Sequence, residues 1–459
     1  MHRPCRSWRA TAISRSPSAT PTPRTTGSGR RSRSSADTSA SRVFPTRLGP
    51  APSAARGSDQ GWFLRRPCSK QLVRLGSLLD ESCLGIGPRF LSLGWAVTSM
   101  PNALPSAEQQ LQFLVQVQRL LAEGSFVSTY KFALLLALAD LAVEKGDDSE
   151  AELSLPLKTI AEKVITLYWR QTLPYVGPVS GQPTLLQQRS NGQHATILDR
   201  IVETRQATAA SLGRARQHAS WSGLIKEVAG VLKGYPLTTL QKVGGGHEAF
   251  LYDEPPSSDH IVLKPGVAYS FCRFHELIED MAQGAWLRFV RRLDGNQAAL
   301  GQVSDLHEFL FGSERADLAD YRPLLAAWQS DRCFYCGTPL HGPGQVDHFV
   351  PWARYSIDLG HNFVLAHGDC NNDKSDLLPD VEHLRHWCER NEQQGHLMAE
   401  AFQKHGLPHD LEASRQIARW AYAQTEVTAG LVWLRKKDSP LALDASWRSL
   451  LGPTTAPAT

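Results

Sequence analysis

Apolar residues recur at helical spacing through most of the chain after residue 100. Ser106 and Gln109 have the spacing of a capping box, and the apolar stripe that follows them predicts a first helix. Ser128 is the expected N-cap of a second helix. That helix contains the apolar run 132–143, which is shorter than the roughly 18 residues that span a bilayer, so we expect a buried core helix and no membrane association. The first stripe comprises Leu111, Leu114, Val115, Val117, Leu120 and Leu121, and further helices are predicted at 157–169, 196–216, 219–233, 271–292 and 323–329.

A different pattern begins near Lys242. The glycines at 244–246, followed by short apolar segments at 249–252 and 261–263, predict a β-hairpin. The glycine triplet lacks the Gly-Lys-Ser/Thr ending of a phosphate-binding loop, so we interpret it as a turn. Helices dominate and the strands are few and short. The expected fold class is therefore α+β, predominantly α-helical.

The charge of the chain is unevenly distributed. The 459 residues, enough for two or three domains, include 49 Lys+Arg and 45 Asp+Glu, which give a net charge of +4. Residues 1–99 alone hold 16 basic residues, 15 of them Arg, and only four acids, so the rest of the chain has a net charge of −8. Eight cysteines are too few for a disulfide scaffold.

The basic segment 1–99 has few apolar residues over its first 60 positions, so we expect disorder there. Three interpretations stay open: a tail that binds nucleic acid, an Arg- and Ser-rich transit peptide, or an extension of the gene model before a true start at Met100. The excess of Arg over Lys and the change of character after Met100 favour the third. We therefore leave this segment out of the functional argument.

A second basic segment lies inside the acidic remainder. Residues 155–242 hold 11 Lys+Arg and four acids. Such a segment is either a surface that faces nucleic-acid phosphates or a solvated helix face, and both interpretations stay open.

Two pairs of soft metal ligands stand about thirty residues apart, Cys333 with Cys336 and His367 with Cys370. Ligand pairs of this spacing on either side of a compact element are typical of a structural Zn²⁺ site with four tetrahedral ligands. A structural metal of this kind also stabilises a short module that cannot build a sufficient core. The sequence therefore predicts a structural zinc site.

Harder metal ligands lie close to these pairs. Asp347 and Asn371 offer oxygen donors, which suit Mg²⁺ or Mn²⁺ rather than Zn²⁺. His348 adjoins Asp347 at the end of an apparent strand. Neighbouring strand residues point to opposite faces, so both can serve one site only if the strand ends or bends there. Pro351 is consistent with such an ending.

The segment 331–380 resembles the HNH endonuclease family. The Asp347-His348 pair, a Pro three residues after the His, Asn362 14 residues after it and Asn371 nine residues later all follow the order and spacing of that family. The resemblance implies a small ββα-metal module, preceded here by a large helical region and followed by C-terminal helices. The zinc-binding form of the family usually has Cys in place of His367.

The same resemblance implies roles for these residues. His348 would be the general base that activates water, and Asp347 and Asn371 would bind one catalytic Mg²⁺ or Mn²⁺. Asn362 would pin the loop between the two strands. An ordinary histidine pKa of about 6.5 suits a general base near neutral pH, and a metal on the scissile phosphate stabilises the leaving oxygen. For Lys374 two interpretations stay open, a contact to the substrate phosphate and an exposed helix lysine.

We therefore expect a cytoplasmic, metal-dependent HNH endonuclease that hydrolyses phosphodiester bonds in DNA, in a restriction or defence system with a partner protein. One alternative is a non-catalytic zinc-knuckle protein that binds nucleic acid, and another is a helical structural protein with an incidental zinc. A nuclease of the PD-(D/E)xK class is excluded because the chain has no Glu-x-Lys.

The domain organisation follows from these segments. Residues 331–390 hold five basic and nine acidic side chains, so affinity for DNA must come from elsewhere, with 155–242 as the first candidate. The expected domains are a 1–99 extension, a helical domain at 100–240, a connecting region at 241–330, the HNH module at 331–390, and C-terminal helices with a tail at 391–459.

Overall fold

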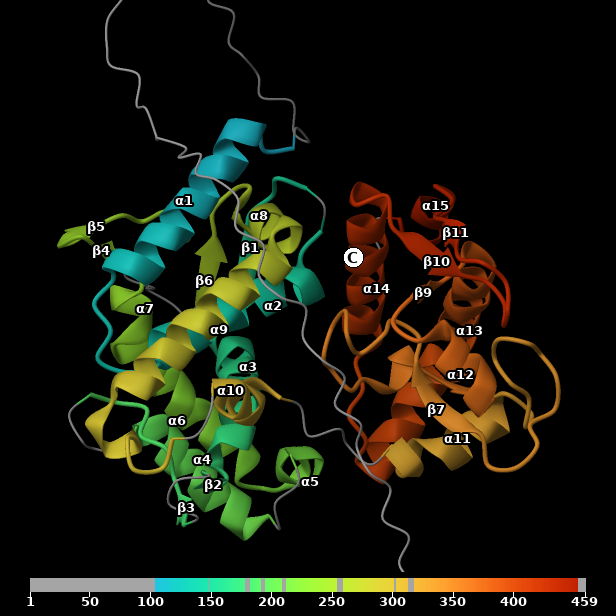
Figure 1. Ribbon diagram of the computed structural model, residues 1–459, viewed down its shortest axis with the longest axis horizontal. Helices are drawn as coiled ribbons and strands as arrows, with labels where there is room; N and C mark the ends of the chain where they lie inside the picture. Colours follow the sequence, from blue (N-terminus) through green and yellow to red (C-terminus); the bar gives the residue numbers. More distant parts are fainter. Residues whose placement is uncertain are drawn as a thin grey trace, which may run out of the picture. The chain divides into compact units, whose positions relative to one another are not determined.

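Helix α2 (Tyr130–Lys145) is the central element of the helical region (Figure 1). Every residue in it except Asp140 and Lys145 is buried, which is typical of a helix surrounded by others. The expected core helix at 132–143 is therefore confirmed. The helices packed around α2 are α3 (Leu157–Trp169), α8 (Val267–Arg273), α9 (His275–Arg292) and α14 (Leu411–Val427).

The computed structural model describes residues 104–452, except 148, 178–181, 191–194, 209–211, 254–258, 301–302 and 313–317. The expectations for segment 1–99, its disorder and the start at Met100, lie outside the described residues. The remaining helices of the helical region are α1 (Ala107–Glu123), α4 (Thr196–Ala207), α5 (Leu212–Gln217), α6 (Trp221–Gly234), α7 (Pro236–Thr239), α10 (Val303–Phe311), and the 3-10 helices η1 (Arg170–Thr172), η2 (Asp294–Asn296) and η3 (Leu318–Tyr321).

The first helix begins as its sequence indicates, and it buries most of the predicted stripe. The Ser106 hydroxyl accepts from the Gln109 amide at 3.2 Å, and the Gln109 side chain accepts from the Ser106 amide at 2.7 Å, which forms the predicted capping box. Val117 and Leu120 of the stripe are buried together with Phe113, and Leu114 and Leu121 pack against the same core. Leu111 and Val115 are the stripe residues that stay exposed. The sequence therefore predicted both the start of the helix and most of its buried face.

The predicted hairpin around residue 250 is wrong in its pairing. Strand β6 (His260–Leu263) pairs antiparallel with β1 (Leu153–Pro156), and the segment 249–252 contributes only a single bridge from Tyr252 to Leu263. The glycine triplet is a turn, as expected, and joins β4 (Lys242–Val243) to β5 (Gly246–His247), with Gly244 and Gly245 at positive φ. A further short pair joins β2 (Tyr175–Val176) to β3 (Pro183–Thr184).

The C-terminal part contains the ββα unit and the helices that pack on it. Residues of this part, from Cys333 to Leu451, share a hydrophobic core that also receives Val143 of α2. Among the described residues, no helix is long and apolar enough to cross a bilayer. The elements are α11 (Arg322–Trp328), β7 (Gln345–His348), η4 (Gly360–Asn362), β8 (Phe363–Ala366), α12 (Gly368–Lys374), β9 (Leu378–Pro379), α13 (Val381–His405), α14, β10 (Leu431–Trp433), β11 (Leu441–Ala442) and α15 (Trp447–Leu451).

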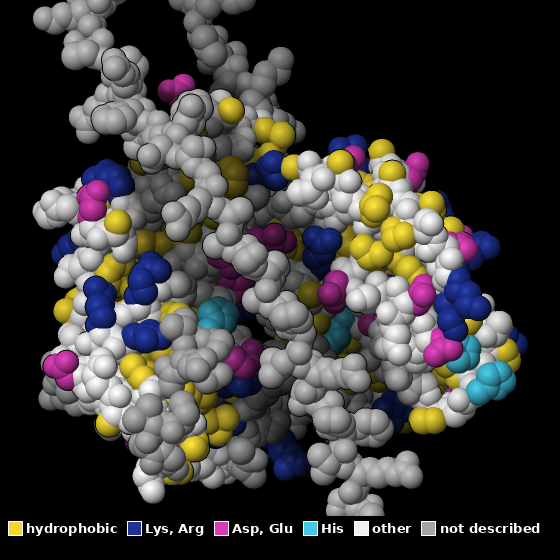
Figure 2. Space-filling model, viewed as in Figure 1, with side chains coloured by type: hydrophobic (Ala, Val, Ile, Leu, Met, Phe, Trp, Pro, Cys, Tyr) yellow, Lys and Arg dark blue, Asp and Glu magenta, His cyan; other side chains and the backbone are white. Residues whose placement is uncertain are grey.

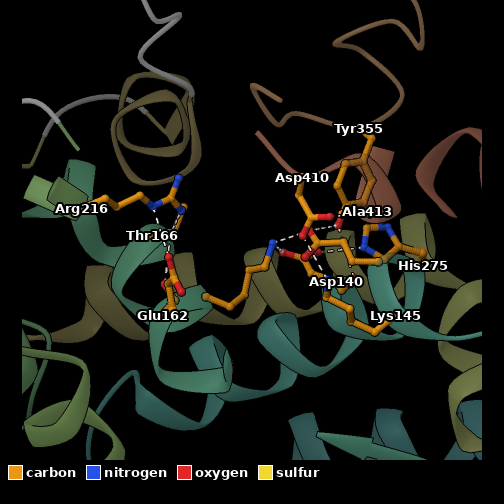
Figure 3. A network of polar contacts seen from close by, with 11 residues as sticks. Asp140, Lys145, Glu162, Thr166, Arg216, His275, Tyr355, Asp410 and Ala413 are labelled. Carbon is orange, nitrogen blue, oxygen red and sulfur yellow. Dashed lines mark hydrogen bonds and ion pairs between the residues drawn. The ribbon is translucent and has the colours of Figure 1, made fainter. Parts of the chain in front are cut away.

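A buried polar network joins the helical region to this C-terminal part (Figure 3). On α2, Asp140 accepts from His275 Nε2 at 2.9 Å and Glu144 pairs with Lys163. Tyr355, from the loop after β7, donates to Glu144 Oε1 at 2.9 Å. Buried charges of this kind remain ionised only when they are paired, so the network fixes which side chains meet at this junction.

The basic segment 155–242 forms ion pairs rather than a uniform positive surface. Five of its basic residues are bound to acids: Lys163, Arg170, Arg200, Arg216 and Lys233. In Figure 2, the Lys and Arg side chains on one face of the molecule are dark blue, and the Asp and Glu side chains are magenta. The charge that this segment could offer to a phosphate backbone is therefore smaller than its residue count indicates.

His275 is expected to make the stability of the protein depend on pH. Burial would lower its pKa, but the hydrogen bond and charge of Asp140, helped by Glu279 and Glu144, raise it above the ordinary 6.5. Lys163, Tyr355 and Trp420 also face this network.

A raised pKa means that the protonated imidazole stabilises the fold below about pH 6.5, and that this contribution is lost as the pH rises through the folded-state value. Urea unfolding of wild type and His275→Gln between pH 5.5 and 8.5 measures the effect. The stability difference should shrink as the pH rises, and a constant difference would contradict the assignment.

Candidate functional site

Strands β7 and β8 with helix α12 form a ββα unit. The two strands are antiparallel, with Asp347 opposite Val364 and His348 opposite Phe363. The backbone amide of Phe334 donates to Leu365 at 2.9 Å, which attaches the Cys333–Cys336 turn to β8. Helix α12 then starts one residue after His367, so both ligand pairs lie at the same end of the unit.

The four soft ligands meet as predicted. The ligand atoms of Cys333, Cys336, His367 and Cys370 all lie within 4.8 Å of one another. Cys336 Sγ is 3.3 Å from His367 Nδ1, and the His367 amide donates to Cys333 Sγ at 3.3 Å. Three thiols and one imidazole are the donor set of a tetrahedral zinc site.

The thiols of this cluster have strongly divergent pKa values. Burial raises the pKa of Cys370 to about 12, and the neighbouring thiols of Cys333 and Cys336 contribute to this increase. Burial also opposes ionisation of Cys336, but hydrogen bonds from Thr338, Cys333 and His367 lower its pKa to about 6. Thiols this close cannot all ionise by themselves, and a bound divalent cation is what would stabilise them together.

Asp347 is buried and already holds two partners through one oxygen. Its Oδ2 accepts from the Tyr335 hydroxyl at 2.6 Å and lies 3.3 Å from Lys374 Nζ. Its exposed fraction is 8%. Burial, together with the charge of Asp347, raises the pKa of Tyr335 well above 10, so the phenol stays a donor. Asp347 Oδ1 has no such partner among the described residues.

Lys374 has a different environment from the expected one. Its exposed fraction is 0%, so the interpretation as an exposed helix lysine is wrong. Helix α12 packs on β7, and position 374 on the inner face of that helix brings the ammonium group to Asp347. Burial lowers the pKa of Lys374, while the charge of Asp347 opposes that shift. Among the described residues its charged partner is this carboxylate, and a substrate contact remains a prediction.

Asn371 lies three residues before Lys374 on the same helix, and its amide nitrogen donates to Gln345 Oε1 at 3.1 Å. Gln345 and Asp347 are two residues apart on β7 and so share one face of the strand. Asn371 and Asp347 therefore belong to facing surfaces of α12 and β7. Both offer an oxygen, the donor type that Mg²⁺ and Mn²⁺ prefer.

His348 points to the other face of β7. Its Nε2 lies 2.8 Å from Asp358 Oδ1, and its ring contacts Phe363 and Trp352 edge to face at centroid distances of 4.8 and 5.1 Å. The bond to a carboxylate makes Nε2 the protonated nitrogen, which leaves Nδ1 as the basic one. Strand β7 ends at this residue, as Pro351 indicated.

Asn362 closes the loop between the strands. Its Oδ1 accepts from the Val350 amide at 2.8 Å and its Nδ2 donates to the Val350 carbonyl at 3.1 Å. The backbone carbonyl of Asn362 also accepts from the Phe349 amide at 2.8 Å. The side chain is 5% exposed, so these bonds satisfy backbone groups that water cannot reach.

Comparison with known families locates two matching segments. Residues 108–310 match a domain of unknown function (DUF8808), and residues 333–377 match HNH endonuclease. The second segment is an HNH module. Its cluster of three cysteines and one histidine is compatible with an HNH zinc-binding module. No curated protein and no solved structure matches the chain.

Tyr335 and Asp358 are the two site residues that the sequence analysis missed. Tyr335 lies inside the Cys333-Phe-Tyr-Cys336 turn, and only the fold directs its hydroxyl to Asp347. Asp358 lies ten residues after His348 in a loop with no regular spacing to it. An acid that follows a candidate histidine base in the same loop weakly indicates a hydrogen-bond partner for that histidine. This signal is present in the sequence.

Zinc content provides a direct check of the soft-ligand cluster. Protein purified without chelator is expected to contain about one zinc per chain, since four ligands form one tetrahedral site. Replacing a ligand in Cys336→Ser should reduce that content strongly. Cys388→Ser is the matched control, because Cys388 is a buried thiol of α13 outside the cluster. Elemental analysis that finds zinc unaffected by Cys336→Ser would refute the site.

Loss of the Asn362 side chain is expected to destabilise the module. Asn362→Ala leaves a buried amide and a buried carbonyl of Val350 unpaired, at a cost of about 2–4 kcal/mol in unfolding free energy. Asn372→Ala, which changes an exposed asparagine of α12, should cost less than about 0.5 kcal/mol. Denaturant unfolding compares the two variants. Equal unfolding free energies would mean that the hydrogen bonds between Asn362 and Val350 contribute nothing to stability.

Proposed function

We propose that the protein is a metal-dependent HNH endonuclease that hydrolyses phosphodiester bonds in DNA. The observation that carries this proposal is the state of His348, whose Nε2 is held by Asp358 while Nδ1 remains without a hydrogen bond to any described residue. A positioned imidazole with one basic nitrogen is what a general base requires. The HNH match of the surrounding segment supplies the reaction class.

In this proposal His348 Nδ1 takes a proton from the attacking water. Asp347 and Asn371 would hold one Mg²⁺ or Mn²⁺, which would supply positive charge to the leaving 3′ oxygen. Asp347 would offer Oδ1, because Oδ2 is occupied by Tyr335 and Lys374. Lys374 would then hold the carboxylate at Oδ2, on the side away from the metal. It would reach a substrate phosphate only if its ion pair with Asp347 were broken.

DNA affinity has to come from outside the module, because the 331–390 segment has more acids than bases. We assign this task to the helical domain 100–240, where Lys158 and Lys226 have no acidic partner among the described residues. The region 241–330 would connect it to the module at 331–390, and 391–459 would form the supporting C-terminal helices. A cytoplasmic restriction or defence system with a partner protein is the biological setting we propose.

One specific observation favours a second candidate, a zinc-knuckle protein that binds nucleic acid without cutting it. The ion pair with Lys374 already balances the charge of Asp347. A carboxylate that has a buried lysine as its counter-ion needs no metal for its own stability. In that case His348 and Asn371 would be structural polar residues. Divalent metal would then neither produce cleavage nor change the binding of the protein to DNA.

Cleavage assays separate the two candidates. The full chain, incubated with supercoiled plasmid and Mg²⁺ or Mn²⁺, is expected to produce nicked or linear DNA. His348→Ala should lower the rate at least 100-fold, because removing a general base typically costs 10²–10⁴-fold. His396→Ala is the matched control, an exposed histidine of α13 that should cut like wild type.

The interpretation of each result is direct. Cleavage by His348→Ala at the wild-type rate contradicts the mechanism. Binding of DNA without cleavage under either metal favours the second candidate.

A further inference from the structure

The loop from Phe349 to Leu359 joins β7 to η4, and it links the proposed catalytic histidine to the helical region. Its base is closed by the two bonds between Asn362 and Val350. Beyond the base, two side chains of the loop turn to different partners. Tyr355 contacts helix α2, and Asp358 contacts His348.

Tyr355 is anchored by its hydroxyl and by its ring, and its contacts in the helical region are Glu144, Asp140 and His275. The hydroxyl donates to Glu144 Oε1 at 2.9 Å and lies 3.4 Å from the Asp140 carbonyl oxygen. The ring contacts His275 and Trp420 at centroid distances of 5.6 and 5.7 Å. At 7% exposure, the residue is a buried anchor rather than a surface contact.

The acceptor of that hydroxyl is itself fixed. Glu144 pairs with Lys163 of α3, and Lys163 Nζ lies 3.9 Å from Asp140 Oδ2. Burial would favour the neutral form of Lys163, but Glu144 and Asp140 raise its pKa and keep it charged. Burial, together with the charges of Asp140 and Glu144, raises the pKa of Tyr355 well above 10. The phenol therefore donates throughout the neutral pH range.

Three residues farther along, Asp358 Oδ1 accepts a hydrogen bond from His348 Nε2 at 2.8 Å. Both side chains are largely buried, at 13% and 15% exposure. The Ile357 amide donates to the Tyr355 carbonyl at 2.9 Å, which tightens the intervening chain. Three residues span at most about 10 Å, so the anchored Tyr355 and the His348 partner Asp358 lie on one short stretch of the loop.

We propose that Tyr355 and Asp358 are positioning residues for His348, and that the helical region thereby sets the orientation and tautomer of the general base. The proposal rests on the proposed function. Asp358 holds the proton on Nε2, so that Nδ1 faces the attacking water, and Tyr355 holds the loop that carries Asp358. The helical region thus acts on catalysis through a specific contact as well as through DNA binding.

We call the connection from Glu144 through Tyr355 and Asp358 to His348 the tether. A double-mutant cycle in the full chain tests it. Asp358→Ala is expected to reduce the cleavage rate at saturating DNA about tenfold or more, the usual effect of losing a partner that orients an active-site histidine. Tyr355→Phe, which keeps the ring and removes the hydroxyl, should reduce it by a smaller factor. Neither should change the DNA dissociation constant. Because both act on the same imidazole, the double variant should be no slower than Asp358→Ala.

A second readout does not depend on cleavage. In protein labelled with ¹⁵N-histidine, the His348 ring, assigned by the loss of its signal in His348→Gln, should show the Nε2–H tautomer. Asp358→Ala should give mixed tautomers, and Tyr355→Phe should shift the population in the same direction. Tyr252→Phe is the matched control, since it removes a buried hydroxyl bond to Leu237 within the helical region.

The outcomes are distinguishable. Independent, multiplicative rate losses in the double variant, or a His348 tautomer unchanged in both single variants, would overturn the tether while leaving the nuclease intact. If wild type cuts no DNA, the proposed function fails, and the tautomer measurement still decides the tether. A Tyr355→Phe protein that loses no more thermal stability than Tyr252→Phe and still shows the tautomer shift excludes a purely structural role.

Discussion

The pleat of strand β7 is the constraint on which the site depends. Neighbouring side chains of a strand point to opposite faces, so Asp347 and His348 meet two separate environments although they are adjacent in sequence. Asp347 faces α12 and is held by Tyr335 and Lys374. His348 faces the loop and is held by Asp358. The strand ends at His348, which is where one substrate could reach both faces.

Each of these two environments has its own energetic cost. On the Asp347 side, a carboxylate and an ammonium group are removed from water, which is tolerable only because they pair and the Tyr335 hydroxyl adds a hydrogen bond. Loss of either charge would leave the other buried and unpaired. On the His348 side, the loop is kept closed by Asn362 and anchored by Tyr355. The contacts on the first side hold the Asp347 carboxylate in place, and those on the second side hold the loop that orients the His348 ring.

The sequence predicted those parts of the structure that local spacing determines. The capping box at Ser106, the helix at 157–169 and the four soft ligands all follow from fixed intervals along the chain. The partner of strand β6 did not, because β1 lies more than a hundred residues earlier and nothing local specifies that pairing. The burial of Lys374 and the contact of Asp358 with His348 depend in the same way on packing between elements.

The HNH module is therefore part of a larger structure rather than a separable unit. Its core is shared with α13 and α14, where Trp387 stacks on Phe349 at a centroid distance of 5.0 Å, and it includes Val143 of α2. A segment with more acids than bases would also repel DNA by itself. The shared core ties the module to α2 of the helical region, and the proposed DNA affinity would have to come from outside the module. The hydrogen bond from Tyr355 to Glu144 adds a polar contact between the two parts, at the loop that carries the partner of His348.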